Sequence, residues 1–285
     1  MDFVKGCLIV LVMIGHFLPG TLQDNPIRYV IYSFHMPVFF FVSGTLYSGH
    51  ATMKDYFKRM GIPWLVAIQV YYLLTNHLNL SVLSYVKAYA VPYYHLWYVV
   101  GFLFCITIVK LCKSNTCILL GLSSVFVLMT CVLQNFDFVV WKLVSYTIRP
   151  QYLLFFTIGM ISRNHMGGGT RRAIVPAILF VLFLPFGFQC QAYWWEKIVR
   201  YAILCVSLIH IDLLRYNMRD VMICKLGKTT FPIYLWHVIG KLGALYITHG
   251  NYNIWYYLIA LCYSSVLIIF LIKNKNKKIQ GIIGR

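Results

Sequence analysis

Three short polar stretches carry residue types that can do chemistry, and each lies within an otherwise apolar part of the sequence. The first holds Lys5 and His16, the second is centred on His35, and the third ends in Tyr234 and His237. Ionisable side chains are expensive in an apolar interior and are found there mainly where they serve a function. An imidazole in low dielectric stays neutral, and a neutral imidazole is a competent general base. These stretches therefore indicate a reaction or a transport pathway.

The composition predicts an all-α, polytopic integral membrane protein. Hydrophobic residues make up 60% of the 285 positions and charged residues 11%, whereas soluble domains average roughly 25% charged residues. A spanning helix needs about 20 apolar residues, so the length allows about ten transmembrane helices in one domain, residues 1–285, without a soluble accessory domain. The segments predicted from hydropathy are 3–19, 28–48, 60–79, 94–112, 116–134, 149–162, 173–189, 197–214, 229–248 and 254–272. Residues 136–146 are predicted to form an interfacial or re-entrant piece.

The distribution of lysine and arginine orients these segments. Seventeen of the 25 cations fall in loops and in the tail on the side of the chain ends, five fall on the opposite side, and three lie within predicted spans. Because cytoplasmic loops carry the excess of positive charge, both termini are expected in the cytoplasm. The net charge of +18 does not indicate nucleic-acid binding, since the cations are spread over short loops and form no single basic face.

The nine cysteines include no C-x-x-C pair, and most of them lie within apolar segments. A thiol in such a segment packs as a small hydrophobic group. We therefore expect no disulfide framework and no zinc or other metal site.

Helical rise gives an expected depth for each histidine. His16 lies fourteen residues after Asp2, about 21 Å along a helix, and thus in the outer half of the bilayer. His35 lies about 10 Å in from the outer side and can share that depth. His237 is expected about 12 Å from the cytoplasmic side, with Tyr234 nearly one turn away on the same face. The alternative for each histidine is a structural role, bonded to a backbone carbonyl.

Two further motifs lie where predicted spans begin. Lys58 and Arg59 precede the third span, where a helix start and its cations favour an anion. Arginine binds phosphate in a bidentate manner, so Arg59 is the first candidate for a phosphate-bearing ligand; the alternative is a cytoplasmic loop that is merely positive. At the start of the fourth span, the structural alternative is that Trp97 and Tyr98, or at least one of them, are interfacial anchors, and the expectation is then that His95 is solvated.

In this order the motifs resemble the acyltransferase-3 family of bacterial membrane O-acyltransferases, over essentially the whole chain. The matching strings are Asp2-x-x-Lys5-Gly6 with Gly15-His16, Phe34-His35-Met36-Pro37 through Ser43-Gly44, Lys58-Arg59 ahead of Pro63, His95-Leu96-Trp97-Tyr98, Phe156 with Gly159, and Gly227-Lys228 with Thr230-Phe231-x-x-Tyr234-Leu235-x-His237. The family pattern also has an arginine three residues before Arg59, where this chain has Tyr56. The resemblance further implies more residues ahead of Asp2 than Met1 alone.

The resemblance implies transfer of an acyl group, usually acetyl from cytoplasmic acetyl-CoA, to a sugar hydroxyl. The acceptor would be a cell-surface polysaccharide or its lipid-linked precursor. The protein would lie in the bacterial inner membrane, in contact with membrane lipids. His16 would act as the base on the acceptor hydroxyl or pass the acyl group on, and Lys5 would orient the site or complement negative charge. His35 and Tyr234 would donate to the developing oxyanion. The residues expected to take part in catalysis are His16, Lys5, His35 and Tyr234. The residues expected to bind the donor are Arg59, Lys58, Trp97 and His237. Acetyl-CoA would be the one cofactor-like molecule, and no metal is expected.

Two other classes of protein remain open on the residues alone. A transporter of a lipid-linked sugar or an organic anion would also have histidines within spans and a kinked helix. A scaffold within a glycan-assembly complex is the third possibility, and the buried cations disfavour it. Consumption of acetyl-CoA in the presence of a glycan distinguishes an acyltransferase from both.

Overall fold

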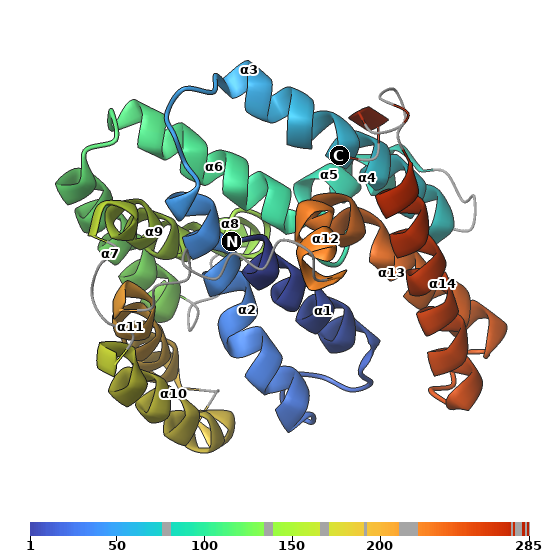
Figure 1. Ribbon diagram of the computed structural model, residues 1–285. Helices are drawn as coiled ribbons and strands as arrows, with labels where there is room; N and C mark the ends of the chain where they lie inside the picture. Colours follow the sequence, from blue (N-terminus) through green and yellow to red (C-terminus); the bar gives the residue numbers. More distant parts are fainter. Residues whose placement is uncertain are drawn as a thin grey trace. The chain divides into compact units, whose positions relative to one another are not determined.

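The computed structural model describes residues 1–75, 81–133, 139–165, 171–190, 193–210, 222–274, 276, 281, 282 and 284. Within these residues the chain is helical and has no strand, as predicted (Figure 1). The chain divides into two compact units, each assembled from separate parts of the sequence. The first unit is Met1–Gly20, Lys54–Val99 and Asn217–Arg285, and the second is Thr21–Met53 and Val100–Tyr216.

The first unit is built around α1, α13 and α14. Its elements are α1 (Asp2–Phe17), most of α3 (Met53–Tyr56), a π-helical turn (Phe57–Gly61), α4 (Ile62–Thr75), α5 (Val82–Ala90), the start of α6 (Trp97–Leu111), α12 (Met222–Lys228), α13 (Thr230–Ile247) and α14 (Ile254–Lys273). Helix α1, drawn in dark blue, packs on the orange helices α12 and α13, and α13 packs on α14 (Figure 1). Two ends of the sequence therefore form one core.

The second unit is built around the packing of α2 on α9 and of α10 on α11. Its elements are α2 (Pro26–Thr45), the rest of α6, α7 (Thr116–Leu133), α8 (Val139–Thr147), a 3-10 turn (Pro150–Tyr152), α9 (Leu153–His165), α10 (Arg171–Gln189) and α11 (Trp194–His210). Most of α8 lies within the piece predicted as interfacial at 136–146, of which residues 136–138 lie outside the described residues.

A helix overlaps each of the ten segments predicted from hydropathy. Two of them, α7 and α14, are long and apolar enough to cross a membrane, and α6 and Ile174–Gln189 are shorter apolar helices. The parts of the predicted segments at 76–79, 134 and 211–214 lie outside the described residues.

One connection between predicted spans contains a helix. Residues 222–228, which the sequence places between the eighth and ninth spans, form α12, which buries Cys224, Leu226 and Gly227. Helix α12 runs antiparallel to α1, because Gly6 faces the carbonyl of Ile223 and Gly227 faces that of Asp2. A methyl group at either glycine would overlap the facing carbonyl, so small residues permit this backbone contact. The sequence 222–228 is too short to show a helical period, which is why hydropathy missed it.

Pro37 lies inside α2, and the helix continues through it. Proline has no N–H, so the carbonyl of Ser33, four residues earlier, loses its helical donor. Arg200 of α11 donates to that carbonyl at 3.1 Å. The same guanidinium bonds to Glu196 at 2.7 Å, and the hydroxyl of Tyr29 donates to Glu196 at 2.6 Å. A buried polar network in the second unit thus supplies the hydrogen-bond donor that Pro37 lacks.

Candidate functional site: three converging histidines

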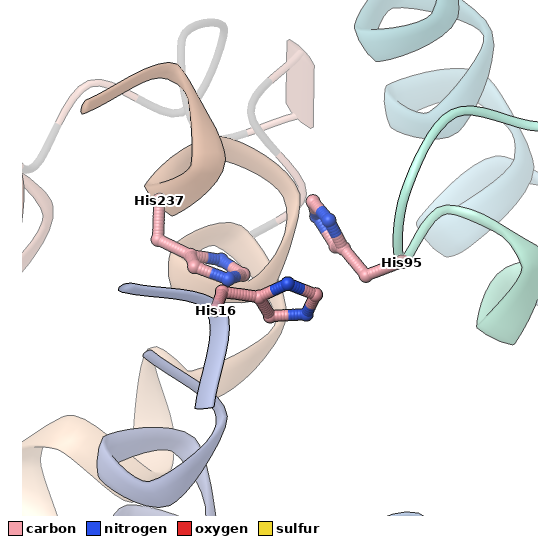
Figure 2. Close-up of side chains that lie close together, drawn as sticks. All are labelled: His16, His95 and His237. Carbon is pink, nitrogen blue, oxygen red and sulfur yellow. The ribbon is translucent and has the colours of Figure 1, made fainter. Parts of the chain in front are cut away.

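Three imidazoles from distant parts of the sequence converge within the first unit. The ring centroid of His16 lies 5.4 Å from that of His95 and 5.2 Å from that of His237, and the last two lie 4.6 Å apart. Figure 2 shows the three rings entering from α1, from the segment before α6 and from α13. One ring nitrogen of each lies within 4.8 Å of those of the other two. We call these residues the histidine cluster.

His16 occupies the last turn of α1 and is the partly exposed member of the cluster. The helix ends at Phe17, and the buried hydroxyl of Tyr256 in α14 donates to the Phe17 carbonyl at 3.1 Å. One of the carbonyls that a helix end leaves without a partner is thereby satisfied by a side chain. This bond holds the end of α1, and therefore His16, against α14.

His95 lies in a tight turn that leads into α6. Tyr94, just before it, has a left-handed backbone with φ of 49°, a strained conformation for a side chain of this size and one that is frequent at functional sites. The indole of Trp64 donates to the carbonyl of Leu96 at 2.9 Å, on the other side of His95. The His95 side chain is 3% exposed, so the expectation that it is solvated is wrong. The turn folds it inward, and tertiary packing covers it.

His237 is fixed in one tautomer by its own helix. Its Nδ1 lies 3.0 Å from the carbonyl oxygen of Ile233 and 2.9 Å from that of Tyr234. Carbonyl oxygens only accept, so Nδ1 carries the proton and the neutral ring has its lone pair on Nε2. That Nε2 is buried and has no hydrogen-bond partner.

His95 has unused hydrogen-bonding capacity as well. Both of its ring nitrogens are buried without a partner that meets hydrogen-bond geometry, although the carbonyls of Tyr234 and Leu235 lie nearby. Buried polar atoms nearly always have a partner, and an exception in a native site calls for an explanation. A molecule that enters the cluster and exchanges hydrogen bonds with these nitrogens provides one.

Aromatic side chains enclose the histidine cluster. The ring of Tyr234 packs edge-on against His95 at 4.6 Å and lies 5.2 Å from Tyr98. Tyr71, fully buried in α4, lies 6.0 Å from His95 and donates its hydroxyl to the Leu235 carbonyl at 3.0 Å. The site therefore combines neutral bases with a wall of rings that limits the access of water, which suits proton transfer from a hydroxyl.

The sequence profile of the acyltransferase-3 family, described as an acyltransferase domain, matches residues 1–273. The chain belongs to this family. Two curated relatives are the nodulation proteins NolL of Sinorhizobium fredii and of Mesorhizobium japonicum, each 40% identical over 67 residues. That stretch is 21% of this chain and 18% of each relative, so the match spans about a fifth of their length. No solved structure gives a significant match.

In this member of the family three of the residues expected from the sequence come together. His16, Tyr234 and His237 lie in the histidine cluster or against it. Trp97, the first residue of α6, is 5% exposed and packs on Tyr98, so it is a buried part of the wall. The sequence assigned His237 to donor binding, which stays a prediction; its ring lies 5.2 Å from that of His16.

Three cations of the first unit lie away from the histidine cluster. Lys5 bonds to Asp2 at 2.7 Å in the first turn of α1, eleven residues and thus about 16 Å of helix before His16. Lys58 and Arg59 are exposed on the π-helical turn Phe57–Gly61. Single π-helical turns are frequent at functional sites, and these two side chains are accessible to a ligand.

His35 belongs to the second unit, where it is buried in α2. Its Nδ1 lies 2.7 Å from the Ile31 carbonyl, and its ring packs on Tyr32 at 4.8 Å. It therefore makes the bond expected of a structural histidine. That His35 shares the depth of His16 stays a prediction.

Sequence reasoning missed His95 as a member of the site. Counting residues put His237 about 9 Å nearer the cytoplasmic side than His16. Their rings lie 5.2 Å apart, a separation that two side chains extending toward each other can reach from such an offset, so the two depths stay predictions. The signal for His95 was its position beside two aromatic residues after Pro92, which also fits an inward turn.

Proposed function

We propose that this acyltransferase moves an acetyl group from cytoplasmic acetyl-CoA to a sugar hydroxyl. The acceptor is a cell-surface polysaccharide or its lipid-linked precursor. The protein works as one multi-pass domain of about ten spans in the bacterial inner membrane, with both termini in the cytoplasm. Family membership supports acyl transfer, and the unsatisfied nitrogens of the histidine cluster are the observation that carries the proposal.

His16 is proposed as the general base because it is the partly exposed member of the cluster. It takes the proton of the sugar hydroxyl while that oxygen attacks the thioester carbonyl carbon. The new C–O bond forms, the C–S bond breaks, and the departing CoA sulfur takes the proton back from the imidazolium. The lone pair of His237 faces the same space, so His237 can accept a hydrogen bond from the acceptor hydroxyl or from a protonated His16.

Donors for the developing oxyanion are proposed on the other side of the cluster. A neutral His95 has one N–H, and neither ring nitrogen makes a hydrogen bond of good geometry, although the carbonyls of Tyr234 and Leu235 lie nearby. The Tyr234 hydroxyl is carried by a ring that packs on His95. Donors placed before the reaction in a water-poor site stabilise an oxyanion more than water does. His95 thus joins Tyr234 in the role that the sequence gave to His35.

The donor phosphates are proposed to dock on Arg59 and Lys58. Both side chains are exposed, and the guanidinium of Arg59 can bind phosphate oxygens in pairs. Lys5 is proposed to orient the cytoplasmic end of the site, since it lies about 16 Å of helix from His16 and forms an ion pair with Asp2 in the first turn of α1. The acyl arm would reach the histidine cluster between helices of the first unit, where Trp97 contributes to the wall.

The membrane location is supported by large apolar side chains on the outside of three helices. Each of the following is at least 48% exposed: Ile118, Val125, Leu128 and Val132 of α7, Ile174, Val175, Ile178 and Val181 of α10, and Ile254, Trp255, Leu261 and Val266 of α14. Water-soluble proteins rarely expose contiguous apolar patches of this size, whereas lipid tails match them. The positive-inside distribution of cations gives the orientation.

The test is thioester turnover by the purified protein in detergent or vesicles. With acetyl-CoA and the glycan of its host, the protein should release free CoA thiol and add the mass of an acetyl group to the sugar. Omission of the glycan should reduce thiol release to the hydrolytic background. A host strain that lacks the protein should lose that acetyl mass from its surface glycan. Transport of the glycan without consumption of acetyl-CoA would instead identify the transporter alternative.

A further inference from the structure

The histidine cluster has the donor set of a transition-metal site. Three imidazoles present one ring nitrogen each, and the nitrogens lie within 4.8 Å of one another. Among the described residues this group of possible ligands contains histidines and no carboxylate. Imidazole suits zinc, copper, cobalt and nickel, whereas magnesium and calcium take oxygen ligands. Three histidines with a fourth position open are the ligand set of several catalytic zinc sites.

The bonds that orient the rings agree with this assignment. Histidines that bind a metal almost always donate their other ring N–H to a carbonyl, a carboxylate or water. His237 does so, with Nδ1 on the carbonyls of Ile233 and Tyr234 and with Nε2 left as a buried lone pair without a partner. His95 lies beside the carbonyls of Tyr234 and Leu235 and has a second nitrogen to offer. The structure thus prepares two lone pairs that no protein donor uses.

The separation of the nitrogens is close to that of a bound state. Bonds of about 2.0–2.1 Å in a tetrahedral site place two ligand nitrogens about 3.3 Å apart. The longest separation here is at most 4.8 Å, so the rings must approach by at most about 1.5 Å. His16 lies at the last turn of a helix and His95 in a turn, and small rotations of these two side chains are enough.

We propose that the histidine cluster binds one divalent transition-metal ion, with zinc as the representative ion. The site is formed by His16, His95 and His237, with water or a hydroxyl as the fourth ligand. Lys241 lies one turn after His237, and its positive charge acts on that imidazole. This positive charge repels a cation, so the metal affinity of the site is lower than that of three histidines without a neighbouring lysine. Removal of the Lys241 charge therefore tightens metal binding.

The metal and the reaction proposed above use the same lone pair of His16. A metal-bound imidazole cannot accept a proton, so the metal-bound state is an inhibited state of the enzyme. This consequence rests on the proposed function, while the metal site itself does not. Zinc would inhibit acyl transfer reversibly, and a chelator would restore it.

The experiment measures metal on the full-length protein in detergent, without acyl donor or acceptor. We expect one zinc per chain to remain after gel filtration into metal-free buffer. We also expect cobalt to give the visible absorption of a four-coordinate site. His95→Phe and His237→Phe should each weaken binding by tenfold or more, and Lys241→Gln should strengthen it. His249→Asn is the matched control, because His249 is an exposed histidine of the same unit, and its zinc content should not change.

Two results would overturn the metal site. The first is a wild-type protein that retains no zinc or cobalt at micromolar concentration, a result that needs no variant to fold. The second is zinc retained equally by His95→Phe, His237→Phe and the wild type, which would place the ion on exposed histidines. A protein that turns over the thioester but binds no zinc or cobalt would remove only the metal site. A zinc-binding protein without thioester turnover would remove only the proposed function.

Discussion

Two buried polar groups of this protein differ in whether their atoms are satisfied. In the second unit Glu196 accepts hydrogen bonds from Tyr29 and from Arg200. Arg200 also donates to the Ser33 carbonyl, which has no helical donor because residue 37 is proline. In the first unit both nitrogens of His95 and Nε2 of His237 are buried without a partner. Both groups are in contact with aromatic rings, so burial alone does not distinguish them.

The difference indicates a division between support and chemistry. A closed network such as that of Arg200 stabilises one arrangement of helices and has no capacity left for a ligand. The histidine cluster, by contrast, contains buried polar atoms without partners. Each such atom lowers the stability of the fold by its desolvation cost, about 1–3 kcal/mol. A site retains such atoms where a substrate or an ion binds to them. Substitutions in the two groups should therefore affect different measurements.

The largest expected effect is that of His16→Ala on turnover. A general base contributes about 10²–10⁴ to a rate, so kcat for acyl transfer should fall by that factor while the thermal midpoint changes little, because His16 is partly exposed. The measurement is release of CoA thiol with saturating glycan. Wild-type turnover in the His16→Ala protein would remove His16 as the base, and His249→Asn serves as the control.

Arg200→Met should have the largest effect on stability. It leaves Glu196 as an unpaired buried charge and the Ser33 carbonyl without a donor, a loss of about 3–5 kcal/mol. Thermal unfolding in detergent measures it.

A second substitution separates the two parts of that loss. Pro37→Ala restores a backbone N–H at position 37 for the Ser33 carbonyl, so it should lessen the effect of Arg200→Met. Purely additive effects of the two substitutions would show that Arg200 does not serve the gap left by Pro37.

His95→Phe should separate activity from stability most clearly. Phenylalanine keeps the ring and removes two unsatisfied nitrogens, so the midpoint of unfolding should stay or rise, by up to about 1 kcal/mol in stability. Turnover should fall tenfold or more, because the oxyanion loses a donor. A clear loss of stability with unchanged turnover would assign His95 to packing and would end the contrast between the two groups.

The smallest expected effect is that of Tyr256→Phe. It removes the hydroxyl that holds the Phe17 carbonyl, one neutral hydrogen bond worth about 0.5–1.5 kcal/mol. Because that bond positions the end of α1, kcat should fall severalfold while KM for the donor changes less. Tyr257→Phe, one position further on α14, is the control and should leave both values unchanged.

Much of the site could be predicted from the sequence, but its completion could not. The polar residues within apolar segments marked His16, Tyr234 and His237, and all three lie in the cluster or against it. His95 was missed because an aromatic residue next to a predicted span end is usually an interfacial anchor. No local pattern shows that the turn at Tyr94 directs the neighbouring imidazole inward. The pairing of Pro37 with Arg200 was equally hidden, since 163 positions separate the two residues.

The sequence by itself determined the helical class, the ten apolar segments and the family, because hydrophobic length and motif order are local properties of the chain. Only the tertiary structure decided which histidines meet and which polar atoms remain unsatisfied. Those properties depend on contacts between α1, α13 and the turn before α6, which lie far apart in sequence. A hydrogen bond that is present or absent across such a contact leaves no mark on either segment alone. That distinction separates the open histidine cluster from the closed network around Arg200.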